Sequence, residues 1–142
     1  MNSFIRKITR INPAANAFHF TVFLFRVAVS IELIVAHGLK KIGVGTAAAE
    51  IVPNPLHISQ TLNQCLAVAS NLFFPVLILF GMLTRLAVLP VLAVTLTGYF
   101  VLHWNDPLLV KDMPYMYSVC FLLLLVLGPG KYSIDYFIYK RQ

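Results

Sequence analysis

Four long apolar stretches constrain the fold of this 142-residue chain more than any other feature. A helix needs about 20 apolar residues to cross the hydrocarbon core of a bilayer. The stretches that reach or approach this length are residues 18–37, 62–80, 86–102 and 115–127, and the last extends toward Met113. They predict an all-α integral membrane protein built as a bundle of four transmembrane helices.

The composition excludes several classes of protein. Apolar residues make up 59% of the chain and charged residues only 11%, whereas a soluble domain is about a quarter charged. So apolar a chain could not cover a water-facing surface, and we exclude a soluble enzyme, a nucleic-acid-binding module and a disordered segment. The first span does not look like a cleavable signal peptide, because Arg26 and Glu32 interrupt its apolar run.

The basic residues predict the orientation in the membrane, because Lys and Arg accumulate on the cytoplasmic side. With four spans, both termini share a side with the turn between the second and third helices. That side carries seven basic residues, and the opposite side carries Lys40, Lys41 and Lys111. We therefore expect both termini in the cytoplasm. The seven are Arg6, Lys7, Arg10, Arg85, Lys131, Lys140 and Arg141.

We divide the chain into a basic amphipathic segment (1–17), the four-helix domain (18–130) and an aromatic, basic cytoplasmic tail (131–142). The turn at 81–85 is short, which makes the second and third helices antiparallel neighbours. Gly81 is expected to adopt the left-handed conformation, and Thr84 to cap the following helix. Arg85 is expected to meet lipid phosphate.

Arg26 and Asn71 are the polar residues expected deepest in the membrane. Arg26 lies 11 residues before His37, about 16 Å deeper along a helix. A charge near mid-membrane faces the bundle interior and needs a partner. Asn71 is the expected partner, since Pro75 cannot donate to its carbonyl group. The pair either holds the helices together or forms part of a quinone site or a proton path. Glu32 points about 120° away from Arg26.

A second polar group is expected where the first and third helices end, on the side opposite the termini. Its members are His37, Lys40, Lys41, His103, Trp104 and Asp106. Quinone head groups need hydrogen-bond donors and a proton-exchanging group, which histidine provides near neutral pH. We expect His37, His103 and Asp106 to be catalytic. The residues expected to contact the cofactor are Arg26, Glu32, Lys41, Asn71 and Trp104.

Other interpretations of the same residues stay open. Trp104 and Lys41 could simply anchor the helix ends at the membrane–water interface, with the charge of Lys41 extending toward water. A haem held by His37 and His103 is less favoured, because His37 borders a glycine-rich loop and no second histidine pair lies on the inner side. A metal site formed by His37, His103, Asp106 and Glu32 is also conceivable, but the spacing of these ligands is not diagnostic. Cys65 and Cys120 lie at similar depth and are expected to be small buried residues, although a disulfide is not excluded.

Several blocks, in order, resemble the DoxX family of small four-helix membrane proteins over about residues 20–136. The blocks are Arg26, His37-Gly38-Leu39-Lys40-Lys41, Gly81-Met82-Leu83-Thr84-Arg85, His103-Trp104 and the ending Leu127-Gly128-Pro129-Gly130-Lys131-Tyr132-Ser133-Ile134-Asp135. Many members carry a Glu in the second helix, where this chain has Asn71. Many also carry a Glu at the start of the fourth helix, where this chain has Met113-Pro114-Tyr115-Met116. The family is named after a subunit tied to quinol oxidase and thiosulfate:quinone oxidoreductase activity.

The resemblance implies a multi-pass protein of a prokaryotic inner membrane. Two hypotheses of function follow from it. In the first, the chain is a membrane subunit that handles quinone or electrons at the His37–His103 end. In the second, it is a non-catalytic accessory subunit that packs against other membrane protein subunits.

Overall fold

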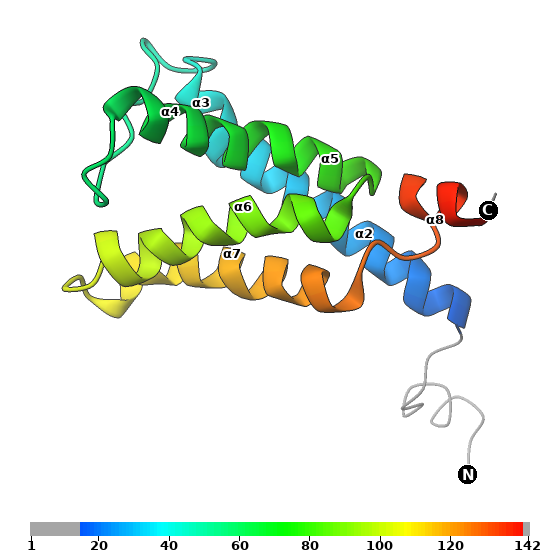
Figure 1. Cartoon of the computed structure of the whole chain (residues 1–142). Coiled ribbons are helices and arrows are strands. Elements are labelled where there is room, and N and C mark those ends of the chain that lie inside the picture. The colour runs from blue at the N-terminus through cyan, green and yellow to red at the C-terminus, as the bar shows by residue number, and fades with distance from the viewer. Residues whose placement is uncertain (1–14, 141–142) are drawn as a thin grey trace.

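The computed structural model describes residues 15–140, and every regular element in that range is helical. Four helices are long and apolar enough to cross a membrane: Ala15–Lys41, Gln60–Phe80, Thr84–Leu102 and Leu108–Leu127. The predicted four-helix transmembrane bundle is thus confirmed (Figure 1). Residues 1–14 of the predicted basic segment lie outside the described range.

Each of the first three spans contains one π-helical turn. The first span is made of α2 (Ala15–Leu33), η1 (Ile34–Gly38) and α3 (Leu39–Lys41), and the second of α4 (Gln60–Val68), η2 (Ala69–Phe73) and α5 (Phe74–Phe80). The third consists of α6 (Thr84–Thr97) and η3 (Gly98–Leu102). The fourth is the continuous helix α7 (Leu108–Leu127), and α8 (Ile134–Lys140) follows it.

The fourth span begins earlier than the sequence pattern predicted. The pattern placed its start near Met113, whereas α7 begins at Leu108 and holds Pro114 inside the helix. A proline within a transmembrane helix is tolerated where neighbouring groups satisfy the freed backbone. Pro114 has no N–H to donate to the carbonyl group of Val110, and the Ser118 hydroxyl makes a separate bond, to the carbonyl oxygen of Pro114 itself, at 2.7 Å.

The apolar core lies where the four spans meet. It contains Val29 and Leu33 of α2, Ile78 of α5, Val88 of α6 and Phe121 of α7. Many large apolar side chains elsewhere on the bundle are exposed, among them Phe73, Leu86 and Val126. A surface of this kind suits hydrocarbon rather than water.

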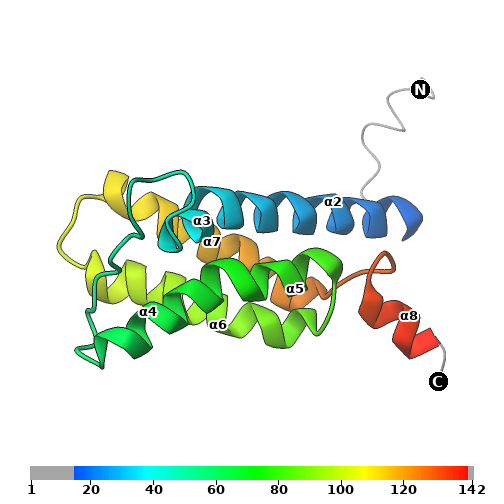
Figure 2. The same cartoon turned by 90° about the horizontal axis from the view of Figure 1, so that it is seen from above.

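The start of α2 and the helix α8 lie at the same end of the bundle in both views (Figures 1 and 2). We call this end, which also holds the α5–α6 turn, the terminal end. The opposite end holds residues 42–59 and 103–107, and we call it the loop end. The orientation of the two termini, both expected in the cytoplasm, stays a prediction.

Candidate functional site: a groove between the first and fourth spans

Arg26 lies at the terminal end, and its expected pairing with Asn71 was wrong. Arg26 is 1% exposed, and its Nη2 donates to the Tyr132 carbonyl oxygen at 2.7 Å. A Cβ placed on Gly81 would collide with the guanidinium group. The helix α2 begins well beyond the α5–α6 turn (Figure 1), so Arg26 is level with that turn rather than with the middle of the bundle.

Asn71 instead lies in η2, at the middle of the second span, and packs against the first span. Its side-chain amide donates to the Ala67 carbonyl oxygen at 2.8 Å, one turn back in the same span. Its own carbonyl group lies against Gly38 of η1. Pro75 has no N–H to give to that carbonyl, as the sequence predicted, but the approaching group is the glycine backbone and not a guanidinium.

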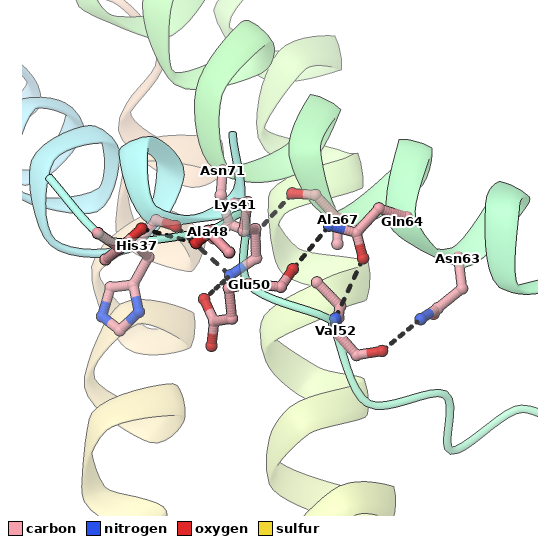
Figure 3. A network of polar contacts seen from close by, with 10 residues as sticks. His37, Lys41, Ala48, Glu50, Val52, Asn63, Gln64, Ala67 and Asn71 are labelled. Carbon is pink, nitrogen blue, oxygen red and sulfur yellow. Dashed lines mark hydrogen bonds and ion pairs between the residues drawn. The ribbon is translucent and has the colours of Figure 1, made fainter. Parts of the chain in front are cut away.

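Lys41 belongs to a network that fastens the loop 42–59 to α3 and α4 (Figure 3). Its Nζ lies 3.6 Å from Glu50 Oε2 and 3.5 Å from the His37 carbonyl oxygen. Gln64 accepts the Val52 N–H at 3.1 Å and donates to the Glu50 carbonyl oxygen at 2.8 Å. These contacts give Lys41 a structural role.

The expected cluster at the loop end divides into two parts. His103 Nδ1 lies 2.7 Å from Asp106 Oδ2, and Lys111 donates to the Trp104 carbonyl oxygen while lying over the Trp104 ring. Within residues 15–140, no hydrogen bond, ion pair or ring contact joins this group to His37.

His37 turns toward the fourth span. Its imidazole points away from the Lys41 network (Figure 3) and meets the ring of Tyr117 edge-on, with centroids 5.4 Å apart. Tyr117 in turn lines a groove between α2 and α7. Tyr117 was not predicted from the sequence, because its place in the groove depends on how two distant spans pack.

The groove between α2 and α7 has a volume of about 430 Å³ and a strongly apolar lining. Glu32 supplies the only carboxylate of that lining. The side chain of Glu32 is exposed, and among residues 15–140 no hydrogen bond or ion pair reaches it. The other lining residues are Phe25, Ala28, Val29, Met113, Met116, Tyr117 and Cys120.

The two cysteines are free thiols. Cys120 lines the groove and is partly buried, whereas Cys65 is exposed on α4, so the expectation that both are buried was wrong for Cys65. In the part of the chain that the structure describes, no three His, Cys, Asp or Glu side chains gather as metal ligands.

Comparison with known proteins points to one family. The DoxX family model matches residues 21–104, which are more than half of the chain and hold Arg26, Glu32, His37, Asn71 and His103. An uncharacterized protein of Haemophilus influenzae is 33% identical over 87 residues. That match spans 58% of this chain and 58% of the relative, so less than two thirds of the relative is covered. No solved structure matches. The chain belongs to the DoxX family.

Proposed function

We propose that this chain is a DoxX-type membrane subunit that binds the head group of a quinone in the groove between α2 and α7. The observation that carries the proposal is Glu32, a carboxyl group in an apolar groove well inside a membrane-crossing helix. Ionisable residues within membrane spans are rare because an uncompensated charge there costs about 2.5–3.5 kcal/mol. Among residues 15–140, no hydrogen bond or ion pair offsets that cost.

The size and lining of the groove suit a quinone ring. Its volume of about 430 Å³ lies within the usual range for small-molecule pockets. Met113 and Met116 are adaptable side chains that pack against flat apolar groups. A protonated Glu32 can donate a hydrogen bond to one carbonyl oxygen of the ring, which fixes its orientation. The groove opens at the exposed face of the bundle, so a lipid-soluble ligand could enter from the bilayer.

Reduction of a quinone to a quinol consumes two electrons and two protons. In the proposal, Glu32 exchanges protons with the ring oxygens, and His37 sits behind Tyr117 as the next proton-exchanging group. The electrons come from a redox partner subunit in the same membrane. His103 and Asp106 contact each other and not His37, so the proposal rests on Glu32, Tyr117 and His37.

We place the subunit in the cytoplasmic membrane of a prokaryote, with both termini inside. Support comes from the basic residues, which are concentrated on the side of the termini and the α5–α6 turn. The family match and the bacterial relative agree with this location.

Neutralising Glu32 tests the proposed function. Glu32→Leu keeps about the size of the side chain but removes its hydrogen-bonding group, and we expect quinone affinity to fall about tenfold, the loss typical of one hydrogen bond. Titration of the purified protein in detergent with a short-chain ubiquinone gives the dissociation constant. Asp112→Asn is the matched control, because Asp112 lies on α7 outside the groove.

Unchanged affinity in Glu32→Leu would overturn the assignment of the groove. A wild-type protein that binds no quinone, but that copurifies stoichiometrically with other subunits, would favour the accessory role instead.

A further inference from the structure

The terminal end carries a second, separate cavity. It has a volume of about 450 Å³ and lies between the start of α6 and the segment that leads into α8. Apolar walls come from Leu83, Leu86 and Pro129, and polar groups come from Arg85, Tyr136 and Tyr139. Because α5 ends at Phe80 and α6 begins at Thr84, and both belong to membrane spans, this cavity lies at the depth of the lipid head groups.

Arg85 is the free cation of this cavity. Its side chain is exposed, and its guanidinium group stands beside the backbone of Gly128, where a Cβ would lie 3.2 Å from Nη2. A glycine at this position leaves room for the guanidinium. Among residues 15–140, no hydrogen bond or ion pair occupies the guanidinium nitrogens of Arg85, which leaves them available to an incoming acceptor.

Asp135, the one acidic group of the cavity, is already engaged. Its two carboxylate oxygens accept the N–H groups of Leu83 and Thr84, at 2.8 and 3.1 Å. This contact caps α6 and directs the negative charge toward the start of that helix. The charge left to face a ligand is therefore the positive charge of Arg85.

The surroundings of the cavity are basic and lie in the interface. Of the five acidic residues in the chain, only Asp135 belongs to the terminal end, whereas Lys131 and Lys140 flank the cavity in the sequence. The helix α8 exposes Phe137 and Ile138, as expected for a short helix that lies in the plane of the membrane surface.

We propose that this cavity binds the phosphate of an anionic phospholipid, such as phosphatidylglycerol. Arg85 pairs with the phosphate, Tyr136 and Tyr139 contact the glycerol region, and Leu83 and Leu86 contact the start of an acyl chain. A combination of one free guanidinium, phenol groups and an apolar wall matches the layered chemistry of a lipid. The site is independent of the groove between α2 and α7.

Native mass spectrometry of the detergent-purified protein tests this site. The protein is titrated with phosphatidylglycerol, with phosphatidylcholine and with inorganic phosphate. We expect phosphatidylglycerol to bind more tightly than phosphatidylcholine, and Arg85→Gln to weaken it about fivefold, the effect of one basic residue near a membrane surface. Lys40→Gln, which removes an exposed cation at the loop end, should leave the affinity unchanged.

Thermal unfolding checks that the Arg85→Gln variant is folded, and Tyr139→Ala gives a second variant at an exposed wall of the same cavity. Equal affinity of wild type and both variants for phosphatidylglycerol would overturn the proposal. So would equal binding of the two lipids. If inorganic phosphate displaced the lipid at millimolar concentration, the site would bind free anions and the lipid assignment would be wrong.

Discussion

Gly38 shows how a single residue sets the distance between two spans. A Cβ at this position would collide with the carbonyl oxygen of Asn71 and lie 3.1 Å from its carbonyl carbon. Both contacts are with backbone, which cannot rotate away as a side chain can. The absence of a side chain therefore lets η1 pack directly on η2, next to His37.

Gly38→Ala should destabilise the bundle by about 1–3 kcal/mol, the usual cost of overpacking a close contact. Gly98→Ala is the matched control. Gly98 also lies in a π-helical turn, but its Cβ would meet only the Pro114 side chain at an ordinary 3.6 Å. We expect that variant to be neutral or slightly stabilised. Thermal unfolding in one detergent compares the two, and equal melting temperatures would show that the Gly38 contact has no importance for stability.

Arg26 illustrates what residue patterns could and could not predict. Its burial was expected from the cost of a charge within a membrane, and the structure confirms it at 1% exposure. Its partner was not predictable, because depth counted along one helix ignores how far that helix extends beyond its neighbours. The same limit applies to Tyr117, which acquires its place in the groove only through the packing of α7 on α2.

At the scale of elements, α8 stabilises the start of α6. The turn at Gly81 adopts the predicted left-handed conformation, with φ of 70°. The predicted cap by Thr84 was wrong: its hydroxyl is buried without a partner in the described residues, and Asp135 caps the helix from a position 51 residues later in the chain. The Asp135 N–H also donates to the Gly81 carbonyl oxygen at 2.9 Å. Asp135 therefore both accepts hydrogen bonds from the α5–α6 turn and donates one to it. A long-range cap of this kind leaves no local signal in the sequence.

Asp135→Ala should lower the free energy of unfolding by about 1–2 kcal/mol, the upper part of the range for loss of a helix cap. Amide hydrogen exchange should speed up in residues 83–86 and in α8, because the carboxylate joins the two elements. Asp106→Ala provides the control, since it removes an exposed pair with His103 at the loop end and should cost little. Unaltered exchange in α8 of Asp135→Ala would contradict the proposed link.

At the scale of the whole molecule, composition and hydropathy were sufficient for the architecture. The number of spans and their order followed from apolar runs and turns, since a bilayer allows few alternatives to a helix. The π-helical turns, the long fourth span and the groove were not predicted. These features depend on contacts between helices. In a membrane span the helix face toward lipid is as apolar as the face toward the core, so the sequence has no periodic signal that separates the two faces.

The proposed function depends most on whether a quinone binds in the groove between α2 and α7. Photo-crosslinking with an azido-quinone, followed by peptide mapping, tests this directly. We predict adducts on the residues of α2 around Glu32 and on residues 113–120 of α7. The adducts should disappear in Ala28→Trp, which fills the groove, and persist in Ile31→Trp, an exposed position of the same helix outside it. Adducts concentrated near His103, or labelling unaffected by Ala28→Trp, would contradict the account.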